Sequence, residues 1–256
     1  MAGRLSTPGA SVVSRAFALL GAFDDRHRGL TLSELSRRAG LPLATTHRLV
    51  AELVELGALA RHGSGQYVVG RRIWSTGLLA PVQTGLRELA SPFLHDIFAA
   101  TRATVHLAVR EGTQVLYLDR LGGSESVPIV SRVGGRLPMH CTGVGKVLLA
   151  HAPQDVVAEV LGSLRRVTPY TVVHADLLAA QLERVRRDGY ATTADEMTIG
   201  ASSVAVPVLR GGTEVVAALG IVVARLRRDR QQLVAALRVA TQGIGRVLDE
   251  SSPPPD

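Results

Sequence analysis

The chain has 256 residues, of which 46% are hydrophobic and 20% charged, so it is ordinary globular material and long enough for one large domain or two smaller ones. A single cysteine excludes an internal disulfide and a cysteine-rich metal site, and the scarcity of aromatic residues argues against a stacking surface for single-stranded nucleic acid. The longest apolar run, 215–224, is far short of the roughly 20 residues that span a bilayer, and no apolar stretch of signal-peptide type opens the chain, so we expect a cytoplasmic protein with no membrane partner, metal or cofactor.

The formal net charge of +7 is concentrated at the front of the chain. Residues 1–81 hold ten arginines and five acidic residues, whereas the longer remainder holds 19 cations and 17 acidic residues. A basic excess confined to one region predicts an acidic partner for that region, such as nucleic acid.

Helical patterns open the chain. Apolar residues at three- and four-residue steps predict a first helix within 11–23. In "LTLSELSRRAGLPLATTHRLVAELVELGAL", Thr31 or Ser33 can cap a short helix, Gly40 suits its left-handed C-terminal position, and Pro42 suits the start of the next helix. Two helices joined by so tight a turn predict a helix-turn-helix.

The second helix of this pair has an apolar stripe at Leu49, Leu53 and Leu56, which leaves its other face exposed. A β-hairpin is predicted directly after it, with strands at 59–62 and 66–69 around a Gly-Ser-Gly turn. This order of helices and a two-stranded wing predicts a winged helix-turn-helix.

The same second helix is the candidate DNA-reading element, because in a helix-turn-helix it enters the major groove and nearby cations bind phosphates. Arg48 suits a bidentate bond with a guanine edge, and Thr45 suits a phosphate or a thymine methyl group. Thr46 borders the apolar stripe, so a core position is the alternative for it. The predicted DNA-contacting residues are Arg37, Arg38, Leu43, Thr45, Thr46, His47, Arg48, Arg61 and Arg71.

A linker helix with a break is predicted at 71–84, and the pattern then changes. Further helices are predicted at about 86–101, 152–164, 174–189 and 230–249, and strands at 104–110, 114–120, 126–132, 202–210 and 215–224. Strands with interspersed helices predict an α/β domain, so the fold class is α+β or α/β in two domains. The expected organisation is a flexible tail at 1–10, a DNA-binding domain at 11–70, the linker at 71–84, a second domain at 85–250 and a tail at 251–256.

The stretch "RVGGRLPMHCTGVGKVLLAH" (132–151) contains the only cysteine, Cys141, and the only lysine, Lys146. It fails as a phosphate-binding P-loop at both ends of that motif. Because His140 and Cys141 are adjacent in an extended segment, their side chains point apart, which disfavours thiol catalysis. Thr142 can instead cap a helix whose free amides favour an anion, such as the carboxylate of an organic acid. A glycine-rich helix entry needed only for packing is the alternative.

Three segments in order resemble the isocitrate-lyase-regulator (IclR) family of bacterial transcription factors, nearly from end to end. They are "GLPLATTHRLVAELVELGAL", "GGRLPMHCTGVGKVLLA" and "GYATTADEMTIGASSVAVPV". The resemblance implies a GAF-like effector-binding domain behind the winged helix, and assembly as a homodimer or a dimer of dimers. It also implies binding to a palindromic double-stranded operator, more often as a repressor, with a small metabolite as effector.

The resemblance also implies an effector pocket. Its expected residues are Ile129, Leu137, Met139, Cys141, Thr142, Gly143, Val144, Gly145, Thr193, Asp195, Glu196, Ser202 and Ser203. Asp195 and Glu196 either line this pocket or form a cap or an ion pair in the loop, with Lys146 as a hypothetical partner of Glu196. Thr193 or Ala194 replaces an acidic residue of some relatives, and Ser203 replaces a cysteine, so the identity of the effector does not carry over.

Two functions of other classes remain open on the sequence. One is an enzyme that uses Cys141 or His140 beside a DNA-binding module. The other is an architectural DNA-binding protein without a ligand, which a second domain of this size with a glycine-lined helix entry disfavours.

Overall fold

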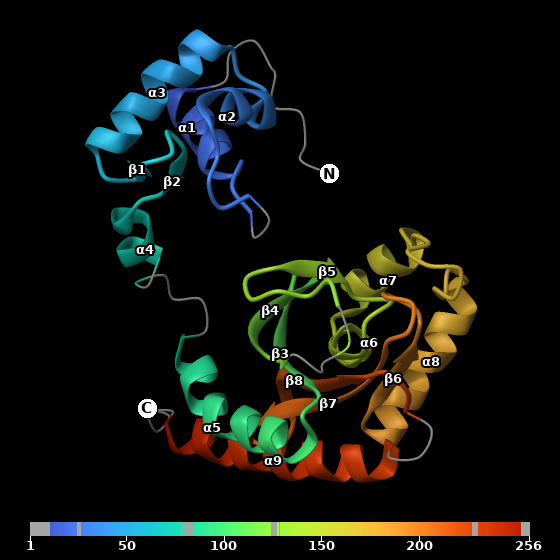
Figure 1. Cartoon of the computed structure of the whole chain (residues 1–256). Coiled ribbons are helices and arrows are strands. Elements are labelled where there is room, and N and C mark those ends of the chain that lie inside the picture. The colour runs from blue at the N-terminus through green and yellow to red at the C-terminus, as the bar shows by residue number, and fades with distance from the viewer. Residues whose placement is uncertain are drawn as a thin grey trace. The chain divides into compact units, whose positions relative to one another are not determined.

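The chain folds into two compact units, Met1–Val82 and Gln83–Asp256, in a computed structural model (Figure 1). The structure describes residues 11–24, 27–77, 79, 84–123, 127, 129–226 and 230–251. The expected tail at 1–10 and residues 252–256 of the expected second tail lie outside these ranges. Each unit is described by itself below.

The first unit is a three-helix fold with a small hairpin. Its elements are α1 (Val12–Leu20), α2 (Leu32–Ala39), α3 (Leu43–Glu55), β1 (Leu59–Arg61), β2 (Tyr67–Val69) and α4 (Arg71–Gly77). Thr31 caps α2 in a reciprocal box with Glu34, and Gly40 ends α2 in the left-handed region with φ of 68°. The helix-turn-helix and its antiparallel wing are therefore confirmed.

The core of the first unit lies between its three long helices. Leu19, Leu35 and Leu49 are buried there together with Leu53. The apolar stripe predicted for α3 is wrong at one position, because Leu56 follows the last turn as its C-cap and is 50% exposed. The buried stripe of α3 continues towards its N-terminus instead, through the side chains at positions 50 and 46.

The second unit carries five helices and six strands in the part of the chain that is described. They are α5 (Thr84–Thr101), β3 (Thr104–Glu111), β4 (Gln114–Leu121), β5 (Arg136–Pro138), α6 (Gly143–Ala150), α7 (Gln154–Gly162), α8 (Ala175–Asp188), β6 (Ala191–Ala194), β7 (Ser202–Arg210), β8 (Glu214–Val223) and α9 (Arg230–Glu250). The predicted helices of this unit and four of its five predicted strands are confirmed.

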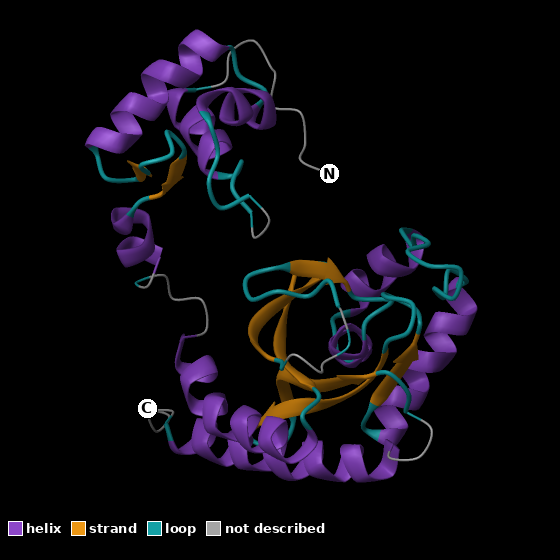
Figure 2. Ribbon diagram, in the orientation of Figure 1, coloured by secondary structure: helices purple, strands orange, loops and turns teal. Residues whose placement is uncertain are grey.

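The six strands form one sheet in the order β5-β4-β3-β8-β7-β6, and every neighbouring pair is antiparallel. The sheet curls around α6, which lies on its concave side (Figure 2). The unit is therefore α+β, and the α/β alternative is wrong. Short hairpins join β3 to β4 and β7 to β8, so the chain returns beside itself without the helical crossovers that a parallel sheet needs.

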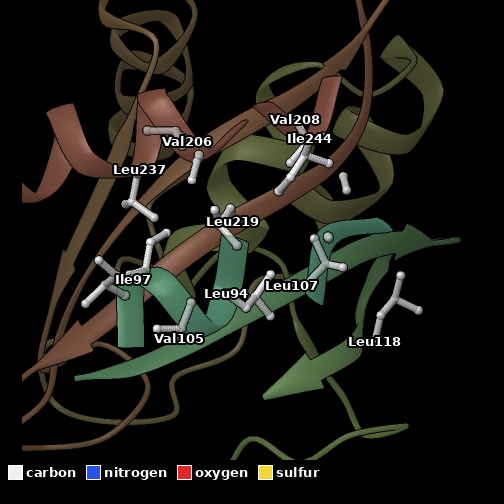
Figure 3. Packing of buried hydrophobic residues seen from close by; sticks show 14 of the residues in the cluster. Leu94, Ile97, Val105, Leu107, Leu118, Val206, Val208, Leu219, Leu237 and Ile244 are labelled. Carbon is white, nitrogen blue, oxygen red and sulfur yellow. The ribbon is translucent and has the colours of Figure 1, made fainter. Parts of the chain in front are cut away.

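Two apolar layers cover the faces of this sheet. On one face α5 and α9 pack through Leu94, Ile97 and Leu237 onto Leu107 and Leu219 of the central strands (Figure 3). On the other face α6 and α8 form a second core with the strands. The site described below opens at the N-terminal end of α6, within the second layer.

The strand predicted at 126–132 is wrong for its described residues, since 127 and 129–132 adopt no regular structure. Pro128 within that run has no N–H to give to a ladder, and the β-branched residues around it supported the prediction without securing pairing. The third strand of this hairpin series is β5, which pairs with β4 from Leu116 to Gln114. Short strands such as β5 and β6 carry too few residues for a detectable alternation.

Candidate functional site

The N-terminal part of α3 presents a polar surface. Leu43 is 52% exposed, His47 and Arg48 are exposed, and Thr45 is partly exposed. Thr46 is fully buried, and its hydroxyl has no hydrogen-bond partner among the described residues. Its predicted contact with DNA is therefore wrong, because its place on the buried stripe turns the side chain into the core.

The arginines predicted to flank α3 fall into two groups. Arg37, Arg61 and Arg71 are exposed. Arg38 is half-buried, and its guanidinium donates to the carboxylate of Asp24 at 2.6 Å and to the carbonyl of Ala22 at 2.7 Å. Arg38 thus ties α2 to the end of α1, which leaves the exposed arginines as the cations of this surface.

A pocket of about 50 Å³ opens in the second unit at the N-terminus of α6. Strands β3, β4, β7 and β8 supply its floor, and the segments 129–131 and 197–201 supply its sides. The lining residues are His106, Tyr117, Ile129, Val130, Ser131, Leu137, Cys141, Thr142, Gly143, Val144, Thr193, Met197, Thr198, Ala201, Ser202, Ser203, Val204, Gly220, Ile221 and Val222. No Asp, Glu, Lys or Arg is among these lining residues of the described part of the chain.

The start of α6 forms one wall of the pocket. Thr142 is the N-cap, and its hydroxyl accepts from the amide of Gly145 at 3.2 Å. The amides of Gly143 and Val144 belong to the first turn of the helix, where no carbonyl lies one turn earlier to accept from them. Beside them, the hydroxyls of Thr193 and Ser203 are joined at 2.6 Å. Two open amides and a hydroxyl pair thus meet at one end of the pocket.

Nine of the residues expected in the pocket line it. They are Ile129, Leu137, Cys141, Thr142, Gly143, Val144, Thr193, Ser202 and Ser203. The other four were placed wrongly. Met139 is fully buried in the core below α6, and Gly145 faces the backbone of Met139. The carboxylate of Asp195 accepts from the amide of Gly200 at 2.6 Å, and that of Glu196 accepts from the ammonium of Lys146 at 2.6 Å. The predicted ion pair of Lys146 with Glu196 is confirmed.

Several residues of the pocket floor were missed from the sequence, above all His106 and Tyr117. His106 stands on β3 and Tyr117 on β4, and their rings meet edge to face with centroids 5.0 Å apart. Ser131 completes the group, with its hydroxyl 2.8 Å from Nε2 of His106. The only signal in the sequence was a polar residue within the apolar run "TVHLAVR".

Burial makes the floor electrically neutral. Burial and, next, the nearby cation of Arg120 lower the pKa of His106 to about 3. Burial also raises the pKa of the Tyr117 phenol, so neither ring carries a charge at neutral pH. The positive end of the α6 dipole is therefore the main electrostatic feature that this pocket offers an anion.

His106 makes the stability of the second unit depend on pH. Because its folded pKa lies below the ordinary value of 6.5, the neutral ring stabilises the fold fully above pH 6.5, and this contribution is lost as the pH falls towards 3. The expected slope is at most about 1.4 kcal/mol per pH unit. Urea unfolding at pH 4, 5, 6 and 7 should show a shallower loss for His106→Asn than for the parent chain. Parallel curves would contradict a buried neutral histidine.

Cys141 and His140 face different surroundings. The thiol of Cys141 lies 3.5 Å from the sulfur of Met197, while Nε2 of His140 lies 2.9 Å from the carbonyl oxygen of Arg165. Burial and, next, the carboxylate of Glu196 raise the pKa of the Cys141 thiol to about 12. A thiol in this state has almost no reactive thiolate at neutral pH.

This state of Cys141 gives a direct prediction for thiol reagents. The folded protein at pH 8 should react with Ellman's reagent at least roughly a hundredfold more slowly than the urea-unfolded chain, whose thiol has an ordinary pKa. The absorbance of the released thionitrobenzoate measures both rates. Rapid labelling of the folded protein would mean that the thiol is activated.

Within the described ranges, no helix is long and apolar enough to cross a membrane. No three His, Cys, Asp or Glu side chains gather there as a possible metal site.

Comparison with known proteins identifies the domain family of both units. Residues 80–246 match the model of the bacterial transcriptional regulator IclR C-terminal domain, and residues 12–63 match that of the IclR helix-turn-helix domain. The chain is 30% identical over 240 residues to the regulator KdgR of Dickeya chrysanthemi, with 91% of this chain and 78% of KdgR covered. It is 31% identical over 212 residues to the Pca regulon regulatory protein of Pseudomonas putida, with 82% and 72% covered.

A solved structure is also similar over almost the whole chain. It is an IclR homologue from Microbacterium hydrocarbonoxydans in complex with 4-hydroxybenzoate, 36% identical, with a TM-score of 0.88 and coverage of 94% of this chain and 100% of that chain. The two domain models match this chain in the order in which its two units occur, and the matches cover most of the length of each relative. The chain therefore belongs to the IclR family and is a DNA-binding transcriptional regulator that responds to a small-molecule effector.

Proposed function

We propose that the effector of this regulator is a small organic acid, and most specifically a hydroxylated aromatic acid, held in the pocket at the start of α6. The observation that carries this proposal is a neutral, largely apolar pocket that ends on the open amides of Gly143 and Val144 beside the Thr193–Ser203 hydroxyl pair. Amides at a helix N-terminus favour a carboxylate, and the apolar walls favour a hydrocarbon body.

The floor supports a hydroxyl group on that hydrocarbon body. His106 is neutral and hydrogen-bonded to Ser131, so this part of the pocket suits an uncharged polar group better than a second carboxylate. The Microbacterium relative binds 4-hydroxybenzoate, which has a carboxylate and a hydroxyl at opposite ends of a ring. The same class of ligand is our expectation for this chain.

The other parts of the proposal concern DNA. Exposed side chains of α3 read base edges of a palindromic operator, and Arg37, Arg61 and Arg71 bind phosphates, in a cytoplasmic homodimer or dimer of dimers that acts as a repressor. The DNA-binding domain comprises 11–70, the linker 71–84 and the effector-binding domain 85–250. The effector acts by shifting the population of DNA-competent conformations.

The experiment is operator binding measured by fluorescence anisotropy with DNA from upstream of the protein's own gene. Binding should be sequence-preferring and should weaken steeply with salt. Within a matched panel, 4-hydroxybenzoate should change the operator affinity at lower concentration than benzoate, which lacks the hydroxyl, or 4-hydroxybenzyl alcohol, which lacks the carboxylate. Equal potency of all three, or no effect of any, would reject the proposed effector class.

The enzyme alternative is tested by the same protein. We infer that Cys141 and His140 do not form a catalytic pair, because the thiol of Cys141 is protonated and the ring of His140 bonds with a carbonyl oxygen rather than with that thiol. Cys141→Ser should keep operator binding and effector response. Loss of a hydrolytic or transfer activity in that variant would support an enzyme instead.

A further inference from the structure

A buried ion pair lies behind the effector pocket and outside its lining. The side chains of Lys146 and Glu196 are 1% and 8% exposed, and the ammonium donates to a carboxylate oxygen of Glu196 at 2.6 Å. The same ammonium donates to the side-chain carbonyl of Gln181 on α8 at 2.7 Å. A single cation therefore joins α6, α8 and the segment that follows β6.

The two partners adjoin two different walls of the pocket. Lys146 lies one turn into α6, and its amide donates to the carbonyl of the N-cap Thr142, directly after the amides of Gly143 and Val144 and the intervening Gly145. Glu196 directly precedes Met197, which lines the pocket. A displacement of Glu196 relative to Lys146 would thus move the 197–201 wall relative to the amides.

The segment around Glu196 is held from several sides. The hydroxyls of Thr168 and Thr171 donate to the carbonyls of Asp195 and Glu196 at 2.7 Å each. Asp195 adopts a positive φ of 59°, and its carboxylate accepts from the amide of Gly200. These bonds fix the backbone of the segment as a unit, and the bond with Lys146 fixes that unit to α6.

Stability alone does not account for the pair. Burial lowers the pKa of Lys146 although Glu196 and the hydrogen bond oppose this, which shows that desolvation of the cation is costly here. The second carboxylate oxygen of Glu196 is buried without a hydrogen-bond partner among the described residues. Two apolar side chains of similar volume often stabilise a fold as well as such a pair does. Unlike the ion pair, however, they do not fix the relative positions of two particular atoms.

We propose that Lys146 and Glu196 are positioning residues of the effector pocket, which set the distance between the α6 amides and the 197–201 wall and thereby set effector affinity. This inference rests on the proposed function of that pocket. It predicts that the geometry of the pair matters to the effector even where the stability of the fold is preserved.

The main variant is Lys146→Met combined with Glu196→Leu, which removes both charges and leaves no buried charge alone. A second variant, Glu196→Asp, keeps the charge and shortens the side chain by one methylene, so it protects the test against a double variant that does not fold. The control is Arg87→Met with Asp119→Leu, which removes an ion pair of 3.2 Å between α5 and β4 on the other face of the sheet.

Two readouts are made on the full-length protein. The first is the 4-hydroxybenzoate concentration that half-changes operator binding, which we expect to rise at least roughly tenfold in both pair variants and to stay within about twofold in the control. The second is amide hydrogen exchange of 195–201 without ligand, which should accelerate in the pair variants only. Operator affinity without effector and the thermal midpoint show that each variant is folded.

The outcomes separate the two proposals. A folded pair variant with parental effector response and parental exchange overturns the positioning role and leaves the proposed function intact. A parent chain that responds to none of the acids overturns the proposed effector class, and the exchange readout alone then decides on the pair. Exchange that remains parental in both pair variants overturns the inference in every case.

Discussion

Arg48→Ala should weaken operator binding roughly 5- to 150-fold, the effect of losing about 1–3 kcal/mol of base-edge recognition. The residue is exposed in the N-terminal half of α3, three residues after the partly exposed Thr45. Because its guanidinium can read a guanine edge, the loss should be large on the operator and small on unrelated DNA. Fluorescence anisotropy titrations on both DNAs measure this ratio.

Two matched variants serve as controls for Arg48→Ala. Arg37→Ala removes an exposed arginine at the end of α2, which we expect to bind phosphate, so it should weaken operator and unrelated DNA by similar factors and lower the salt dependence. Arg187→Ala removes an exposed arginine from α8 of the second unit and should change neither. If Arg48→Ala weakens both DNAs equally, Arg48 binds the backbone and another side chain of α3 reads the bases.

Alanine at two glycines in the first turn of α6 should have different main effects, on stability at Gly145 and on effector response at Gly143. A Cβ atom at Gly145 would lie 2.6 Å from the Cα of Met139 and in contact with its carbonyl oxygen, and neither backbone atom can move away cheaply. We expect Gly145→Ala to lower the free energy of unfolding of the second unit by about 3 kcal/mol. A Cβ at Gly143 would instead lie 2.5 Å from the hydroxyl of Ser203, which can rotate.

Gly143→Ala should therefore cost only about 1 kcal/mol of stability but abolish the response to effector. The new methyl group occupies the space in front of the open amide, and the rotated hydroxyl of Ser203 leaves Thr193. Urea unfolding followed by far-UV circular dichroism gives the free energies of unfolding. Operator titrations with 4-hydroxybenzoate give the effector response. Normal effector response in Gly143→Ala would place the ligand away from α6.

The first unit was largely predictable because its signals are local. A capping residue at Thr31, a left-handed glycine at position 40 and a Gly-Ser-Gly turn each act within a few residues, and the structure uses all three signals. Two predictions for this unit were wrong, one at each end of the apolar stripe of α3. The last turn of α3 ends at Glu55, so Leu56 leaves the apolar stripe, and Thr46 takes its place inside.

The pocket was predictable only where the chain itself brings residues together. The turn from Cys141 to Val144 is continuous, and the resemblance to a family added Thr193 and Ser203. His106 and Tyr117 meet them only because β3 and β4 lie beside β8 and β7 in one antiparallel sheet, and strand order is a property of the whole domain rather than of a segment. Short strands without clear alternation hid that order.

Charge explains why Glu196, which was expected to line the pocket, lies outside its lining. Glu196 directly precedes the lining residue Met197 and carries a charge that a neutral pocket does not accommodate, so its side chain binds the single lysine of the chain instead. The sequence contained both partners, and their pairing was a hypothesis. It could not indicate that Gln181 from α8 would accept a second bond from the same ammonium.

The burial of α6 bears on any attempt to convert this regulator into a biosensor for another inducer. All eight of its residues are buried, and the sheet curls around the helix (Figure 2), so substitutions there would disturb the fold before they altered selectivity. Libraries would better randomise the irregular walls, at Ile129, Val130, Thr198 and Ala201, which contact the ligand space without supporting the core. New specificities should arise from these walls, while the start of α6, the proposed site of the carboxylate, stays unchanged.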